Sequence, residues 1–178
     1  MSVSFIETSF GLCITDFGLV DKNTHILFAG VPLSILDLRK RAGQCFDRFF
    51  PCSDCQFAKN ETVELRWYLL RKDVVPGSKG KDFAEQLSFL TQREAVPRAC
   101  EVVYVTTLYF LARGIRLFAD AATRCADIEP QFINSVAVHV DVGNFKETGL
   151  LVGLLDLDDG RDEDIGLASM VMPMKYKK

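Results

Sequence analysis

The clearest pattern of apolar and polar positions lies between residues 134 and 174. From Val136 to Val142 a valine stands at every second position, which is the two-residue period of a half-buried β-strand. Gly143-Asn144 interrupts this run, and a turn signal follows at residues 146–149. Two further apolar runs come next, at 150–155 and 165–174. The pattern therefore predicts β-strands joined by short turns.

The stretch between the last two apolar runs is strongly acidic. Strands on both sides would hold this mixed apolar and acidic loop, which is how a rigid scaffold presents a binding surface. Residues 151–157 do not keep a strict alternation of apolar and polar positions, so we do not expect them to face one buried side. The alternative is an ordinary acidic loop between two strands.

The rest of the chain contains strand-like and helix-like patterns. Apolar and β-branched runs separated by turn residues predict strands within residues 3–28, and residues 64–71 fit a short strand or helix. The helical patterns are Leu33 to about Phe50, which Pro32 opens; Asp82 to Leu90, which Asp82 can cap; and Arg98 to Phe118, which follows Pro97. Residues 124–127 then lead through Pro130 into the C-terminal strands. This order predicts an α+β fold with helices packed against an antiparallel sheet built from both ends of the chain.

Length and charge limit the class of protein. A chain of 178 residues with 48% apolar residues predicts a single domain, residues 1–178. The net charge is −3 and no basic stripe is present, which argues against nucleic-acid binding. No apolar run approaches about 18 residues, and the N-terminus lacks the pattern of a signal peptide. We therefore expect a soluble protein without membrane insertion, whose localisation and oligomeric state the sequence does not assign.

Cys52 and Cys55 form a CxxC pair, with Cys45 upstream. Such a pair can be half of a zinc site, because four tetrahedral ligands often come as two close pairs. A second pair would have to converge from distant positions, namely Cys100, Cys125, His25 and His139. A redox pair would need a βαβ pattern around it. We interpret these cysteines as partly buried thiols or an adventitious disulfide, so no metal or cofactor is predicted.

Catalytic and calcium-binding patterns are both incomplete. His139 and Asp141 lie on one face of their strand, but no recognisable nucleophile accompanies them, so we interpret His139 as a surface residue. Aspartates alternate around Gly160, but with Gly160 as the sixth position of an EF-hand loop, Leu155 and Leu157 would take the first and third ligand positions. We expect no catalytic residue, no metal and no enzyme activity.

Several short segments resemble a known family. They are Trp67 to Arg71, Val74-Val75-Pro76, Pro97, Leu117-Phe118, Arg124 to Asp127, Val142 to Phe145, Gly149-Leu150, Val152, Asp158 to Asp162 and Ile165 to Ser169. Together they are similar to the variable proteins of diversity-generating retroelements from archaea and small-genome bacteria. The resemblance covers roughly the last two-thirds of the chain. It implies a C-type-lectin-like fold of the formylglycine-generating-enzyme type, with the N- and C-terminal strands paired in one sheet.

In that family a reverse transcriptase rewrites adenine positions near the end of the gene, and the altered side chains form an exposed ligand-binding face. The resemblance implies a variable region at about 144–165. Its candidate ligand-binding residues are Leu151, Gly153, Leu154, Leu155, Asp156, Leu157, Gly160, Asp162 and Asp164. Lys146 and Glu147 are weaker candidates, while Val152, Arg161, Gly166, Leu167 and Ala168 look fixed. The cysteine pair that formylglycine generation needs is not supplied near the C-terminus, so that activity is not carried over.

Two functions follow as expectations. The first is a binding protein whose diversified C-terminal segment recognises protein or cell-surface ligands. The alternative is a structural or assembly protein, such as a phage or virion accessory subunit, in which the same surface packs against one fixed partner.

Overall fold

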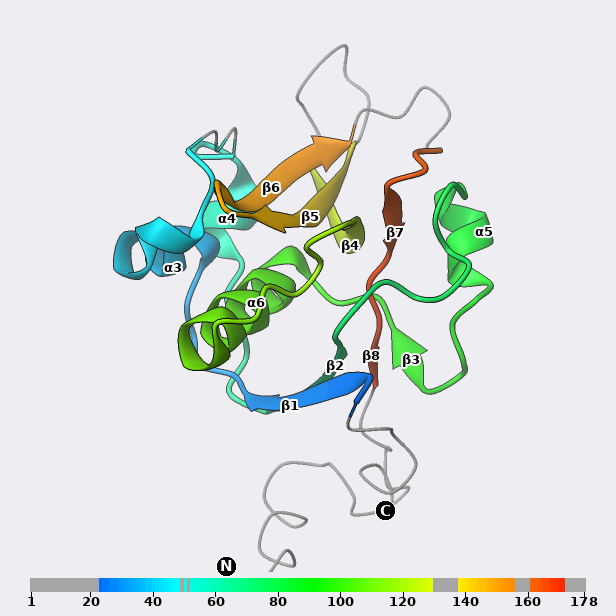
Figure 1. The fold of residues 1–178 in the computed structure, drawn as a ribbon, viewed down its shortest axis with the longest axis horizontal. Coiled ribbons are helices and arrows are strands. Elements are labelled where there is room, and N and C mark those ends of the chain that lie inside the picture. The colour runs from blue at the N-terminus through cyan, green and yellow to red at the C-terminus, as the bar shows by residue number, and fades with distance from the viewer. Residues whose placement is uncertain (1–22, 49, 51, 130–137, 156–160, 172–178) are drawn as a thin grey trace, which may run out of the picture.

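The computed structural model describes residues 23–48, 50, 52–129, 138–155 and 161–171. The helices are α3 (Ile35–Arg41), the 3-10 helix η1 (Gly43–Cys45), α4 (Gln56–Asn60), α5 (Phe83–Leu87) and α6 (Ala99–Arg113). The strands are β1 (His25–Ala29), β2 (Trp67–Arg71), β3 (Glu94–Ala95), β4 (Ala122–Glu129), β5 (Val138–Lys146), β6 (Gly149–Leu155), β7 (Ile165–Leu167) and β8 (Met170–Val171). The fold is mixed α+β, as the sequence predicts, with two sheets in the described residues (Figure 1).

The first sheet has the strand order β1-β2-β8-β3, and its neighbours are antiparallel. It contains strands from near both ends of the chain, as expected. However, β1 and β8 do not pair with each other, because β2 lies between them: Phe28 pairs with Tyr68, and Leu69 pairs with Val171. The expectation of direct pairing is therefore wrong for these two strands. The strands predicted before residue 23 lie outside the described residues.

The second sheet has the order β6-β5-β4-β7, with β7 parallel to β4 and the other pairs antiparallel. The turn predicted at residues 146–149 joins β5 to β6. The sequence pattern missed β4, because residues 122–125 are all buried and so show no alternation.

The core lies where helix α6 contacts both sheets (Figure 1). The Tyr104 hydroxyl on α6 donates to the Ala29 carbonyl of β1 (3.1 Å), while Val142 of β5 is fully buried in the same cluster. The helix begins one residue later than predicted and ends earlier, at Arg113, because Gly114 adopts a left-handed conformation (φ 69°) as its C-cap.

Helix α3 is much shorter than the predicted run to Phe50. Ser34, two residues after Pro32, caps it, and its hydroxyl accepts from the Asp37 amide (3.1 Å). After η1 the chain instead follows the edge of β6, where the Asp47 amide donates to the Leu150 carbonyl (3.0 Å). Gly149 permits this approach, because a Cβ there would lie 2.3 Å from the Asp47 nitrogen. Backbone pairing with β6 therefore replaces the predicted last turns.

The cysteines of the described residues are free and buried, as interpreted from the sequence: Cys45, Cys52, Cys55, Cys100 and Cys125. The Cys52 thiol donates to the Val152 carbonyl (3.7 Å), and burial raises its pKa. A thiol held protonated in this way acts as a small apolar core group.

Candidate functional site

The second sheet has two distinct faces. On the inner face, toward the core, Thr123, Val142 and Val152 lie opposite one another on β4, β5 and β6, and each is 0% exposed. The next residue on each strand points to the other side, which we call the outer face. The outer face contains the row Arg124, Asp141 and Gly153, a second row that includes Gly143 and Leu151, and His139.

The candidate residues on β6 divide between these faces. Leu151 and Gly153 are on the outer face and half-buried. Leu154 lies opposite Val140 and packs against the core cluster, so it does not belong to the exposed face that was expected. As expected, residues 151–154 do not all face one buried side: Val152 and Leu154 face inward, whereas Leu151 and Gly153 lie on the outer face.

Gly153 is closely covered by its neighbour on β5. A Cβ at this position would lie 2.7 Å from the Asp141 Oδ1 atom, which is closer than real Cβ contacts. The carboxylate therefore occupies the space that a side chain at position 153 would need. Any residue other than glycine here requires Asp141 to move.

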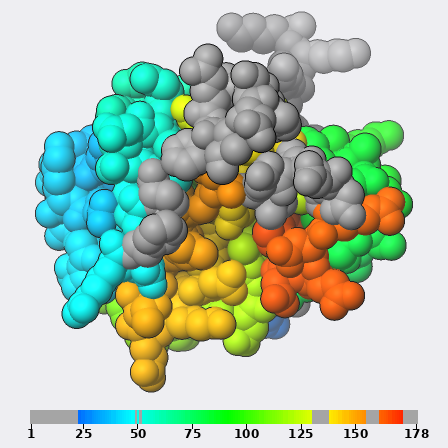
Figure 2. Space-filling view, turned by 90° about the horizontal axis from the view of Figure 1, so that it is seen from above, coloured from blue at the N-terminus to red at the C-terminus, as the bar shows by residue number. Residues whose placement is uncertain are grey.

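The remaining candidates follow β6. Leu155 is the last residue of that strand, and Asp156, Leu157 and Gly160 lie outside the described residues. Asp162 and Asp164 are exposed. Figure 2 shows the β5–β6 hairpin at the surface, between the segment that contains α3 and α4 and the segment that begins at residue 161.

The backbone around Asp162 and Asp164 is held by distant segments. The Ala122 amide donates to the Asp164 carbonyl (3.0 Å), and the Gly80 amide donates to the Asp162 carbonyl (3.1 Å). The Asp162 carboxylate accepts from the Asp164 amide (2.8 Å). The two exposed carboxylates are therefore carried on a fixed backbone.

Helix α5 covers part of the outer face. Asp82 caps this helix, as predicted, and Arg161 pairs with Asp82 at its start (3.4 Å). Arg124 is 0% exposed and donates through Nη1 to the Gln86 Oε1 atom of α5 (2.8 Å). The Phe83 ring lies 4.1 Å from the His139 ring, measured between centroids.

His139 is therefore not the surface residue that the strand pattern indicated. It is 8% exposed because the Phe83 ring packs on it, and its Nδ1 atom has no hydrogen-bond partner among the described residues. Burial lowers its pKa, and the nearby Arg124 guanidinium lowers the pKa further. The imidazole is thus kept neutral near pH 7.

Asp141 is the acidic residue of the outer face, and its pKa is clearly shifted from the ordinary value. Burial raises its pKa to about 6, and the Asp162 carboxylate adds to this, whereas the Arg124 guanidinium opposes it. Burial also lowers the pKa of Arg124. The row couples a buried cation to an acid that titrates near neutral pH, an arrangement that occurs at functional sites and in structural ion networks alike.

Sequence reasoning missed Arg124, Phe83 and Gln86 as parts of this site. One signal was present in the sequence, because Arg124 interrupts a run of small residues from Ala121 to Ala126. A charged side chain in a strand that is buried on both faces needs a hydrogen-bonding or charged partner inside the protein. The contact with α5 had no sequence signal, since it depends on how distant segments pack.

Comparisons with protein-family models, with curated proteins and with solved structures found no match. In the described ranges, no three histidine, cysteine or acidic side chains are grouped as metal ligands. Of the helices described, none has the length and apolar character needed to cross a bilayer.

Proposed function

We propose that this protein is a ligand-binding module on a C-type-lectin-like scaffold, and that residues 144–165 form a surface that a diversity-generating retroelement alters. The ligand is a protein or another cell-surface molecule. The chain itself catalyses no reaction in this proposal.

One observation carries the proposal: the same strand combines a fully buried inner face with an accessible outer position. Val152 is 0% exposed in the core, whereas the adjacent Leu151 is half-buried on the outer face. Substitutions at Leu151 can therefore change the surface while the inner face keeps the strand in place.

The charges near this surface suit a protein ligand. Lys146 and Glu147 are exposed at the β5–β6 turn, and Asp162 and Asp164 are exposed on their fixed backbone. An apolar centre near Leu151 with charged residues around it has the usual anatomy of a protein interface. A fixed backbone lowers the entropy lost on binding, which favours affinity.

The alternative function, packing against one fixed partner, is favoured by a different observation. The Asp141 carboxylate fills the space above Gly153, and Leu154 belongs to the core side. Two of the nine candidate positions are thus restricted by packing, which leaves less freedom for diversification than the resemblance implies.

The DNA around the gene separates these two functions. The proposal expects an adjacent reverse-transcriptase gene and a near-copy of the gene's 3′ end that differs at adenines. If the reverse transcriptase can change the codon of Leu151 but not that of Val152, the variable positions would agree with the outer and inner faces of β6. A locus with neither the reverse transcriptase nor the repeat would contradict diversification and leave the fixed-partner function.

A binding experiment tests the surface directly. A displayed library randomised at Leu151, Lys146 and Glu147 is selected against a panel of purified surface proteins, and a second library is randomised at inward-facing Val142 and Val152. We expect folded binders from the first library only. Equal recovery of folded binders from both libraries would contradict the division of β6 into two faces.

A further inference from the structure

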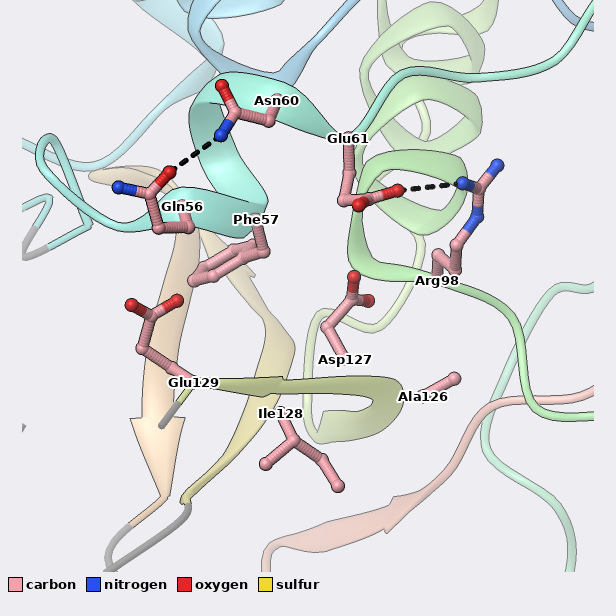
Figure 3. Close-up of a pocket in the computed structure, with 9 residues that line it drawn as sticks. All are labelled: Gln56, Phe57, Asn60, Glu61, Arg98, Ala126, Asp127, Ile128 and Glu129. Atoms are coloured by element: carbon pink, nitrogen blue, oxygen red, sulfur yellow. Dashed lines mark hydrogen bonds and ion pairs between the residues drawn. The ribbon is translucent and has the colours of Figure 1, made fainter. Parts of the chain in front are cut away.

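A second site lies apart from the surface at residues 144–165. It is a cleft of about 440 Å³ between α4, the residue that precedes α6 and the end of β4 (Figure 3). This volume is within the range of roughly 300–1,000 Å³ that small-ligand pockets have. In Figure 3 the carboxylates of Asp127 and Glu129 point from β4 toward α4, whereas Ile128 points the opposite way.

Two of the three carboxylates that line the cleft already have partners. Glu61 pairs with Arg98 (2.9 Å from Oε2 to Nη1), and Arg98 also donates to the Glu101 carboxylate (3.4 Å). Asp127 accepts from the Ala99 amide and so caps the start of α6. These contacts stabilise the walls of the cleft.

The third carboxylate, Glu129, is different. It is 8% exposed, it lines the cleft, and its carboxylate has no hydrogen bond or ion pair with any of the described residues. Figure 3 shows its carboxylate beside Gln56, with the Phe57 ring between it and Asp127. The Gln56 Oε1 atom accepts from the Asn60 side chain (2.6 Å), which occupies that oxygen.

An unpaired charge in a buried position destabilises a fold unless something compensates it. The nearest cation lining this cleft, Arg98, is engaged by Glu61 and Glu101. Glu129 therefore has the features of a counter-ion that no described residue of the chain pairs.

We propose that this cleft binds an organic cation, an ammonium or guanidinium group on an alkyl chain, with Glu129 as its counter-ion. A metal ion fits poorly, because the described part of the chain groups no three metal-ligating side chains. The carboxylates would repel a phosphate. Phe57 gives the cleft an apolar wall for the alkyl chain, and the source is either a basic side chain of a partner protein or a free amine.

Nuclear magnetic resonance of the ¹⁵N-labelled protein tests this site. The probes are agmatine, pentylamine, and two capped pentapeptides of glycine and alanine with a central arginine or lysine. We expect saturable shifts at the Gln56 and Asn60 side-chain amides and the Ala126 backbone amide. Tighter binding of the peptides would identify a protein side chain as the source, and tighter binding of agmatine or pentylamine would identify a free amine.

The variant Glu129→Gln keeps the shape of the side chain and removes its charge. We expect binding at least tenfold weaker, with an unchanged or higher melting temperature. Asp120→Asn, at an exposed position outside the cleft, removes the same charge and is expected to bind normally. Unaltered binding by Glu129→Gln, or no saturable shift with any probe, would overturn the proposal.

A second variant decides the question if Glu129→Gln does not fold. Gln56→Lys changes an exposed residue and brings an ammonium group of the chain itself next to Glu129. We expect it to lose binding of the probes and to melt at a higher temperature than the unaltered protein. Undiminished probe binding by Gln56→Lys, or stronger saturation of these amides by Mg²⁺, Ca²⁺ or Zn²⁺, would overturn the organic-cation site. None of these results depends on whether residues 144–165 vary.

Discussion

The inner and outer faces of the sheet β6-β5-β4-β7 come from the same strands but are filled by different chemistry. The inner face has Val142 and Val152 at 0% exposure, so its stabilisation is hydrophobic and does not change with pH. The outer face has Arg124 and Asp141, which are also buried but are charged or titratable. Both faces therefore contain buried residues. They differ in how the stability of the protein responds when their residues are mutated or the pH is changed.

The largest effect is expected from Arg124→Ala on the outer face. The change would leave the Gln86 Oε1 atom without its donor and the buried Asp141 without its neighbouring cation. We expect a loss of about 3–5 kcal/mol in the free energy of unfolding, measured by urea denaturation. The control is Arg161→Ala, at an exposed arginine that pairs with α5 and should have little effect. Equal losses in the free energy of unfolding for the two variants would mean that the contacts of Arg124 add nothing to the stability of the protein.

The second prediction concerns pH. The pKa of Asp141 is about 6 in the folded protein against an ordinary value of 3.8, so folding favours the protonated form. Its contribution is fully present below pH 3.8 and is lost as pH rises through 6. Asp141→Asn should therefore be more stable than the unaltered protein above pH 6, by up to about 3 kcal/mol.

The measurement for Asp141 is the difference between the two unfolding curves at each pH. Subtracting one curve from the other removes the contributions of other titratable groups to stability. One of these groups is His139, whose lowered pKa makes stability depend on pH in an overlapping pH range. A difference that stays constant from pH 4 to pH 7 would show that Asp141 titrates normally.

The third prediction compares adjacent residues of β6. Val152→Ala removes a fully buried side chain from the inner face and should cost about 2 kcal/mol. Leu151→Ala removes a larger side chain from a half-buried outer position and should cost less than about 1 kcal/mol. Thermal and urea unfolding of both variants would reveal the order, and a reversed order would show that Leu151 is core.

The smallest effect is expected from Gly153→Ala. Its Cβ would meet the Asp141 carboxylate, which should cost about 1 kcal/mol through overpacking. Combining it with Asp141→Ala should remove most of that cost, because the collision then disappears. Gly43→Ala is the control, since a Cβ there meets nothing within 4 Å. Additive losses in the double variant would rule out a collision at this position.

The sequence was a good guide to elements with a regular period or a local cap. The valine alternation predicted β5, Asp82 predicted the start of α5, and residues 146–149 predicted the hairpin turn. These features depend on neighbouring residues alone, so reading along the chain is enough to find them.

Apart from the end of α6, which Gly114 sets locally, the errors involve contacts between distant segments. Helix α3 ends early because residues 46–47 pair with Leu150, and β4 was missed because its first four residues are buried on both faces. His139 was assigned to the surface because its strand alternates, but Phe83 covers it. The apolar run 150–155 forms β6 as predicted, but the division of its residues between two faces was not predicted.

The sequence by itself determined the α+β class, the C-terminal hairpin and the cap of α5, because each follows from local backbone preferences and hydrophobic period. Only the tertiary structure decided which polar residues became buried. Arg124 and Asp141 lie side by side on the outer face, where Gln86 of α5 contacts Arg124, and Glu129 lines the cleft between β4 and α4, because segments far apart in the chain pack there. The desolvation that shifts the pKa values of Arg124 and Asp141 comes from that packing.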